Sequence, residues 1–528
     1  MRKINIICLL ALLMMPIYGH AQREFAPVHG DCLPDNTDDA MVSHRAGVKK
    51  LPAAKTNWDP EKTYRQLVIL VEFPDTTFSY SSTPNTFYHK MFNESGFNDG
   101  NGPGCVADYF RDQSNGMLNL QFDVYGPVKV SKSSQPYSNP TGSTRNYGKE
   151  VFSEAMESVI ADNPGIDFSV YDWNGDHYIE QVIFIYAGYS GNINTSVAYG
   201  HIWPNTSWIN TITTPDGYKI ENYTCSGEVW PTSKPISFGL GTVCHEFTHS
   251  LGLPDIYKTS NGSPICDEWD LMDGGNFTNY GWCPPNFTPI EKWILGWLSF
   301  TDLDSPTTIT GLKPVSEGGE VYRIKHSDTE WLLLENRQHR SWDAGAPGKG
   351  LVIYHVDYNS SAWKANTVNN VDGKPRFELV HADNMDYSAW SNYVAKNKLS
   401  TYAASSHMHN RYLSSSPYPW TTDSTSFVNN ELTVTSVPAP KMNYPNGAGD
   451  YLLDKPITNI RMSEDGLISF DFMGGDKTGI KYVEPQSSNL QSLTYDILGR
   501  RLSSPRAAGF FIQRRGDGTI RKYFKKMQ

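Results

Sequence analysis

Two histidines four residues apart carry the clearest chemical signal in this chain of 528 residues. His245 and His249 enclose Glu246 in the run HEFTH, and helical spacing puts both imidazoles on one face, where they can bind one metal ion. Two nitrogen ligands at this spacing suit zinc. Glu246 can then act as general base on a metal-bound water and as proton donor to a leaving group. The motif predicts a catalytic zinc site.

A third ligand is expected a few residues beyond the helix. Gly252 can take a positive φ without penalty, which ends the helix and turns the chain back. That turn can bring Asp255 to the zinc and leave the fourth position open for water. Two further acids, Asp270 and Asp273, are rival third ligands. The alternative to a metal site is a helix that carries two surface histidines by coincidence, and the added glycine and aspartate make this coincidence rarer.

The elements that must hold the motif are apolar runs bounded by turn residues. The pattern predicts buried strands at 65–73, 117–124 and 178–187, and helices at 106–111, 146–162, 236–251 and 289–298. Residues 252–290 are rich in Gly, Asn and Pro, as active-site walls often are. We therefore expect an α+β catalytic domain over residues 63–300, in which a twisted sheet backs the zinc-binding helix.

The pattern changes after residue 300. Short alternating strands follow one another between turn residues up to about residue 475, and no good helix is seen. This pattern predicts an all-β, sandwich-like module that supports the catalytic domain or binds substrate.

The first 62 residues have the pattern of segments that direct export and processing. Residues 1–21 combine Arg2-Lys3, a short apolar run and a small-residue site ending at Ala21, which indicates a secretory signal peptide. A membrane anchor is the alternative, but the run is short and Pro16 interrupts it. No later stretch is apolar enough for a stable membrane span. Residues 22–62 lack periodicity and read as a propeptide or lead-in.

Latency and disulfides are both suggested by the cysteines. Cys32, in the expected propeptide, could place a thiolate on the open zinc position, as could the carboxylates of Asp31 or Asp35. A simple disulfide at Cys32 is the favoured alternative. Six cysteines remain after the signal peptide, and an even count in an exported chain suggests disulfides, with Cys266 and Cys283 as a plausible local pair.

Overall charge limits the partners. The formal net charge is -11, which argues against nucleic acid, because phosphate binding needs a basic face. Hydrophobic residues form 39% of the chain, enough to bury a large core in two to four domains.

An acidic run before the third strand suggests calcium. Oxygen-bearing side chains alternate there, at Asp172, Asn174, Asp176 and Glu180. An EF-hand is excluded, since the twelfth position is Ile183 and the sixth is His177. A structural Ca2+ site and an Asx-rich turn both remain open.

Several motifs together resemble a known family. With HExxHxxGxxD ahead of it, the run WDLMDGG resembles the Met-turn of metzincins, in which Met272 would pack beneath the histidines without binding zinc. The runs HEFTHSLGLPDIY, EWDLMDGGNF and EKWILGWL are similar to the immune inhibitor A-like metallopeptidases. So are RQLVILVEFPD upstream and LLLENRQHRSWDAGAPGKGLVIYHVDY downstream, so that the likeness covers about residues 64–385.

The resemblance implies a secreted zinc endopeptidase that cleaves proteins or peptides. By it His245, His249 and Asp255 would hold one Zn2+, with Glu246 as the general base. Tyr257 and Tyr280 could supply a hydroxyl that stabilises the tetrahedral oxyanion, although structural roles are the commoner ones.

The C-terminal tail, residues 476–528, resembles a second family. The run TYDILGR, the run GFFI and the basic ending are similar to type IX secretion sorting domains, which implies the type IX secretion machinery as a partner. A solvated basic tail is the alternative. Two other functions also stay open for the whole chain, a non-catalytic surface adhesin and a zinc hydrolase of non-peptide substrates. The intact Glu246 argues against the adhesin.

Overall fold

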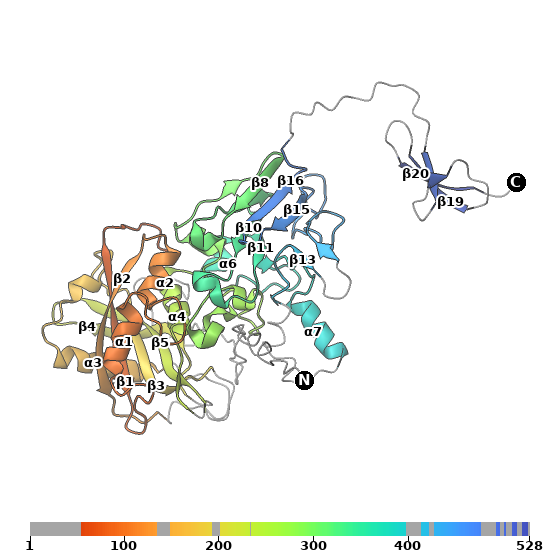
Figure 1. Cartoon of the computed structure of the whole chain (residues 1–528). Coiled ribbons are helices and arrows are strands. Elements are labelled where there is room, and N and C mark those ends of the chain that lie inside the picture. Colours follow the sequence, from red (N-terminus) through yellow and green to blue (C-terminus); the bar gives the residue numbers. More distant parts are fainter. Residues whose placement is uncertain are drawn as a thin grey trace, which may run out of the picture. The chain divides into compact units, whose positions relative to one another are not determined.

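The structure, a computed structural model, describes residues 54–134, 148–192, 201–232, 234–397, 413–421 and 427–476, and the backbone of four short strands nearer the C-terminus. Internal contacts divide the chain into two units, Met1–Gly475 and Asp476–Gln528. The expected signal peptide (1–21) and Cys32 lie outside the described residues. Figure 1 shows the larger unit as helices packed against several sheets.

The first sheet is mostly parallel. Its order is β2-β1-β3-β5-β4, and the short β6 also pairs with β5. Strands β2, β1, β3 and β5 run parallel, whereas β4 pairs antiparallel with β5 and ends the sheet on that side. The strands are β1 (Thr63–Glu72), β2 (Asn119–Lys129), β3 (Val182–Tyr189), β4 (Asn205–Thr213), β5 (Lys219–Trp230) and β6 (Ile236–Ser237).

Helices cover both faces of this sheet. Val68 and Leu70 of β1 join a core with helices α1, α2 and α4, while Leu67 and Ile69 face the opposite core, which contains α3. A strand that is buried on both faces has a continuous run of apolar residues, and for this reason β1 and β3 could be predicted from the sequence. The helices are α1 (Pro84–Asn93), α2 (Val106–Gln113), α3 (Lys149–Asp162), α4 (Gly241–Leu251) and α5 (Pro289–Ile294). The layered, mainly parallel arrangement refines the expected α+β domain.

Helix α4 is shorter than its sequence predicts. It begins at Gly241 instead of residue 236, because Ile236–Ser237 pairs with the end of β5 as strand β6. Gly239 then has a φ of 73°, and a Cβ there would lie 2.5 Å from the backbone of Gly281. This close approach lets the N–H of Leu240 donate to the carbonyl of Gly281 at 2.9 Å, which fixes the start of the helix.

In its described residues, the second part of the larger unit (301–475) contains three sheets, of which the smallest is the pair β13-β14. The five-stranded sheet has the order β12-β11-β10-β9-β7, and the three-stranded sheet has the order β15-β16-β8. Side chains of β10 alternate: Trp331 and Leu333 join the core that contains α4, while Leu332 and Leu334 face the three-stranded sheet. The core around helix α4 thus continues into this part. Its strands are β7 (Thr301–Asp302), β8 (Thr307–Leu312), β9 (Tyr322–Lys325), β10 (Glu330–Arg337), β11 (Gly350–Asp357), β12 (Phe377–Leu379), β13 (Trp420–Thr421), β14 (Val428–Asn429), β15 (Ile457–Met462) and β16 (Ile468–Phe472).

The prediction that this part lacks helices is wrong. Helices α6 (Ser360–Lys364) and α7 (Tyr387–Lys396) lie within it. Each begins at a polar cap, since Asn359 accepts the N–H of Ala362 and Asp386 accepts the N–H of Ala389. The described part of the larger unit also contains five short 3-10 turns, η2 (Phe168–Tyr171), η3 (Asp267–Trp269), η4 (Gly274–Gly281), η5 (Val315–Glu317) and η6 (Ser341–Gly345).

Residues 54–62, expected to be the end of a propeptide, pack into the larger unit. The N–H of Lys55 donates to the carbonyl of Leu251 at 3.0 Å. The indole N–H of Trp58 donates to the carbonyl of Leu295 at 2.7 Å, and its ring packs against neighbouring aromatic rings. This segment therefore contributes to the same core as helix α4.

The expected disulfide between Cys266 and Cys283 is wrong. Both thiols are free and buried, as are those of the other three described cysteines. Their surroundings differ, because the thiol of Cys283 donates to the carbonyl of Trp342 at 3.4 Å while Cys266 precedes η3.

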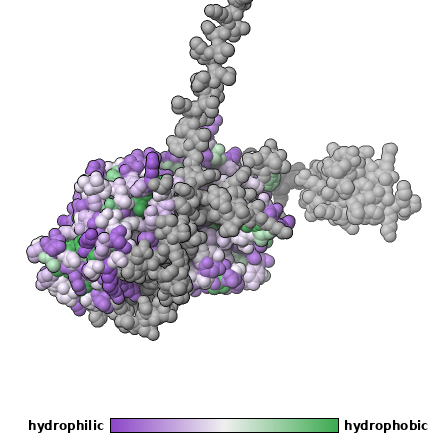
Figure 2. Space-filling model, turned by 90° about the horizontal axis from the view of Figure 1, so that it is seen from below, coloured by the Kyte–Doolittle hydropathy of each residue, from purple (hydrophilic) through white to green (hydrophobic). Residues whose placement is uncertain are grey.

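The described surface is mainly polar. On the face drawn in Figure 2, hydrophobic residues form small separate patches among hydrophilic ones. In the described ranges, none of the helices has both the length and the apolar character needed to cross a membrane. The smaller unit contains an antiparallel sheet of order β18-β17-β19-β20, formed by β17 (Leu493–Asp496), β18 (Arg501–Leu502), β19 (Gly509–Arg514) and β20 (Ile520–Lys525).

Candidate metal centre

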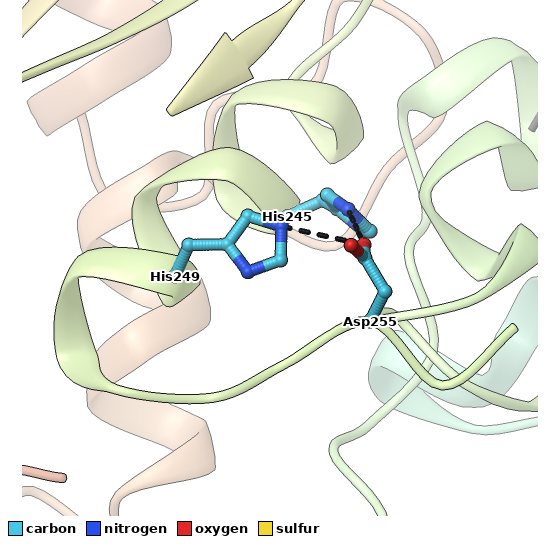
Figure 3. A group of neighbouring side chains, drawn as sticks. All are labelled: His245, His249 and Asp255. Atoms are coloured by element: carbon cyan, nitrogen blue, oxygen red, sulfur yellow. Dashed lines mark hydrogen bonds and ion pairs between the residues drawn. The ribbon is translucent and has the colours of Figure 1, made fainter. Parts of the chain in front are cut away.

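Helix α4 and the loop after it bring three side chains together. His245 and His249 lie on one face of the helix, with ring centroids 5.0 Å apart and ring planes at 89°. The helix ends at Gly252, whose φ of 102° turns the chain back, as the sequence predicts. Asp255 follows this turn, and Figure 3 shows its carboxylate facing both imidazoles. Among the described residues, these three form the one cluster suited to a metal ion.

The spacing of the three side chains fits zinc. Asp255 Oδ1 lies 3.1 Å from His245 Nε2 and 3.3 Å from His249 Nε2. One ligand atom from each residue lies within 4.8 Å of the others. Metal–ligand bonds of about 2.0–2.2 Å in a tetrahedron separate neighbouring ligand atoms by about 3.3–3.6 Å. Small adjustments of the side chains would therefore admit the ion.

The other ring nitrogens are held by backbone carbonyls. His245 Nδ1 lies 2.7 Å from the carbonyl of Leu271, and His249 Nδ1 lies 2.8 Å from that of Leu253. A carbonyl only accepts, so each Nδ1 carries the proton and a neutral imidazole presents its Nε2 lone pair to Asp255. Two lone pairs facing a carboxylate repel it unless a cation lies between them. Without a metal, at least one added proton among the three facing groups would be needed to make the contact favourable.

Asp255 is held in place from outside the helix and its turn. The side-chain amide of Asn366 donates to Asp255 Oδ2 at 2.8 Å, and the N–H of Asp255 donates to Asn366 Oδ1 at 2.7 Å. Burial opposes the charge of Asp255, but positive charge on protonated rings of His249 and His245 would hold the pKa of Asp255 well below its usual range in the metal-free protein. Sequence reasoning missed Asn366, because it lies 111 residues away and no local pattern marks it.

The rival ligands lie elsewhere. Asp273 Oδ2 accepts three backbone N–H groups, those of residues 265, 266 and 267, at 2.8–3.0 Å. Asp270 Oδ1 accepts the N–H of Met272 at 2.7 Å, and burial together with the nearby Glu291 raises the pKa of Asp270 well above its usual value. Both carboxylates shape the turn whose Leu271 carbonyl contacts His245, and neither is in the metal-binding group.

Met272 lies in this same turn. Its side chain is buried in the core that includes helix α4, and its carbonyl accepts the N–H of Ile256 at 2.8 Å, next to Asp255. The turn thus contacts both helix α4 and the loop that carries Asp255. A role for Met272 as a floor beneath the metal stays a prediction.

Glu246 is buried beside the last strand of the first sheet. The hydroxyl of Thr206, on β4, lies 2.5 Å from the carbonyl of Glu246 and 3.3 Å from its carboxylate Oε2. The same hydroxyl is 3.1 Å from that of Thr224 on β5. The carboxylate therefore lies at the boundary between helix α4 and the edge strand.

The two tyrosines are placed differently. Tyr257 is buried and lies two residues after Asp255 in the chain. Tyr280 has a φ of 56°, its ring packs against Trp230, and its carbonyl accepts the Trp230 indole N–H at 3.1 Å. Oxyanion stabilisation by either hydroxyl stays a prediction.

The expected calcium loop closes on itself. Asp172 accepts backbone N–H groups from residues 174–177. Asn174 donates to Asp176 Oδ2 at 3.1 Å, and Glu180 forms an ion pair with Lys55. These contacts are those of an Asx-rich turn, and the calcium prediction finds no support in them.

The segment that contains this site is similar to known proteins. Residues 53–293 match the family model "Immune inhibitor A peptidase M6, catalytic domain". Immune inhibitor A of Bacillus thuringiensis subsp. alesti is 23% identical over 380 residues, which cover 62% of this chain and 53% of that protein. The pre-pro-metalloprotease PrtV of Vibrio cholerae is 23% identical over 279 residues, 45% of this chain and 30% of that protein. A putative secreted metallopeptidase of Arthroderma benhamiae is 21% identical over 295 residues, 45% of this chain and 41% of that protein.

The segment that carries the three-ligand cluster is thus similar to metallopeptidases. The match spans about half of the first relative and less than a third of PrtV.

Proposed function

We propose that this protein is a zinc-dependent endopeptidase. The observation that carries the proposal is the buried cluster of His245, His249 and Asp255, in which both Nε2 atoms face one carboxylate oxygen. The similarity of residues 53–293 to a peptidase catalytic domain supports it. A bound zinc ion supplies a Lewis acid that polarises a carbonyl and lowers the pKa of water.

The chain's own residues supply the remaining chemistry. Glu246, adjacent to His245 on helix α4, would accept a proton from the attacking water and return it to the leaving amine. The hydroxyl of Thr206 donates its single proton to the backbone carbonyl of Glu246 at 2.5 Å, which would fix the part of the helix that carries this carboxylate. The hydrogen bonds from Nδ1 of each histidine fix the ring orientation, so that both Nε2 atoms stay directed at the ion.

Location and export belong to the same proposal. The relative from Arthroderma benhamiae is named as secreted, and the first 21 residues read as a signal peptide. We expect the protein to act outside the cytoplasm, exported through that peptide and sorted by the type IX machinery through its tail.

The direct test compares the wild type with Glu246→Gln on a generic protein such as casein, with zinc measured in both. The substitution removes the base but no ligand, so both proteins should hold about one zinc. Only the wild type should cleave, and the variant's kcat should fall by at least about 100-fold. Chelation should abolish cleavage and added zinc restore it. Zinc in both proteins and cleavage by neither would favour the adhesin or the non-peptide hydrolase.

A further inference from the structure

The loop that begins at Asp255 is hydrogen-bonded to a segment more than a hundred residues later in the chain. We name that segment, residues 366–372, the asparagine segment. Asn369 Nδ2 donates to the carbonyl of Ile256 at 2.8 Å, and Asn370 Nδ2 donates to Thr259 Oγ1 at 2.9 Å. Lys258 also pairs with Asp372 at 2.7 Å. The loop from Asp255 onward therefore takes its shape from the second part of the larger unit.

Asn366 makes the contact that matters for the metal. It bonds both ends of Asp255, because its amide donates to Oδ2 and its oxygen accepts the backbone N–H. These two bonds fix the rotation of the carboxylate. With Oδ2 occupied by the amide, Oδ1 alone faces the histidines, at 3.1 and 3.3 Å.

The backbone of Asn366 suits this role. Its φ is 54°, in the left-handed region, where asparagine is several-fold enriched over most residues other than glycine. The residue is 8% exposed, and its carbonyl accepts the hydroxyl of Thr259 at 2.8 Å. Asparagine is thus placed so that one short amide supplies both the donor and the acceptor.

We propose that Asn366 is a positioning residue that orients Asp255 for metal binding, so that the metal centre is completed by a segment that follows residues 53–293, the part matched by the family model. The inference rests on the proposed zinc site. Partners of metal ligands commonly change metal affinity by about 10–100-fold when they are removed. The second part of the larger unit would then be required for zinc affinity as well as for packing.

The test measures zinc dissociation constants by competition with a chromophoric chelator, using the full chain. Asn366→Gly removes the side chain and tolerates the positive φ. Asn366→Asp keeps the size and the acceptor for the Asp255 N–H, but replaces the donor to Oδ2 with an acceptor. Asn384→Gly is the matched control, because Asn384 is exposed and has a φ of 57°.

We expect both Asn366 variants to bind zinc about 10–100-fold more weakly than the wild type, and the Asn384 variant to bind it equally well. Circular dichroism of the metal-free proteins should be unchanged. If the glycine variant does not fold, the near-isosteric aspartate variant decides the question. If the folded variants bind zinc within about twofold of the wild-type affinity, the role of Asn366 is refuted and the proposed zinc site is unaffected. A wild type that binds no zinc would overturn the proposed metal site and this inference with it.

Discussion

The backbone N–H of Lys55 donates to the carbonyl of Leu251 at 3.0 Å, which joins the first described residues to the last residue of helix α4. The final carbonyls of a helix have no partner within it, so this bond satisfies one of them. The ammonium of Lys55 also pairs with Glu180 and lies 5.3 Å from the ring of Trp173. Residues 54–62 thus stabilise the end of the helix that carries His249.

Truncation should show that this segment belongs to the mature protein. A chain that begins at residue 54 should keep the stability and zinc content of a longer chain. A chain that begins at residue 63 loses the contacts of Lys55 and Trp58, and its free energy of unfolding should fall by about 1–3 kcal/mol. Urea unfolding of both forms measures the difference. Trp58→Ala in the longer chain measures how much of the lost unfolding free energy comes from the indole. Equal stability of the two truncated chains would refute the prediction.

Substitution should separate Asp255 from its rival Asp270. Asp255→Asn removes the carboxylate that faces both imidazoles, so zinc affinity should fall by at least about 100-fold. Asp270→Asn should keep zinc affinity near that of the wild type, because Asp270 caps the backbone of Met272 instead. Zinc per folded protein is the measurement. The reverse result, loss of zinc only with Asp270→Asn, would reassign the third ligand.

His355 should make stability depend on pH. It is buried between Glu330 at 2.8 Å and Glu378 at 3.2 Å. Burial alone would lower its pKa, but the two carboxylates raise it from 6.5 to about 9. The stabilisation is therefore complete below about pH 6.5 and disappears as the pH rises through about 9.

The size of this effect follows from the shift, which corresponds to about 3 kcal/mol. The difference in unfolding free energy between the wild type and His355→Gln should shrink by about that amount from pH 6 to 9.5. Denaturant titrations at several pH values measure it. A difference that does not change with pH would mean that the pKa of His355 is the same in the folded and the unfolded protein.

Reductant should not change the stability of the larger unit. The described cysteines are free, so the melting temperature of the metal-free protein should be the same with and without dithiothreitol. Alkylation after denaturation, without prior reduction, should label Cys266 and Cys283 in the mass spectrum. A fall in melting temperature on reduction, with both residues protected from alkylation, would restore the disulfide that their spacing suggested.

Much of the metal centre could be predicted because its logic is local. The i, i+4 spacing puts His245 and His249 on one helix face in any fold that keeps the helix. Gly252 allows the positive φ that ends it, which returns the chain towards Asp255. The buried strands are also visible, since burial on both faces requires continuous apolar runs. Helix spacing, the sign of φ and apolar runs are properties of a few neighbouring residues, and the sequence determines them by itself.

Other features depend on which distant segments meet, and only the tertiary structure decided them. Asp273 accepts hydrogen bonds from three backbone N–H groups of its own turn. The sequence alone did not distinguish this role from that of a metal ligand. Sequence proximity suggested a bond between Cys266 and Cys283, but both thiols are free and buried. Asn366 orients Asp255 across 111 residues of chain. The physical reason is that hydrogen bonds of buried polar groups are satisfied by whichever partner packing brings within about 3 Å, and sequence distance does not limit that choice.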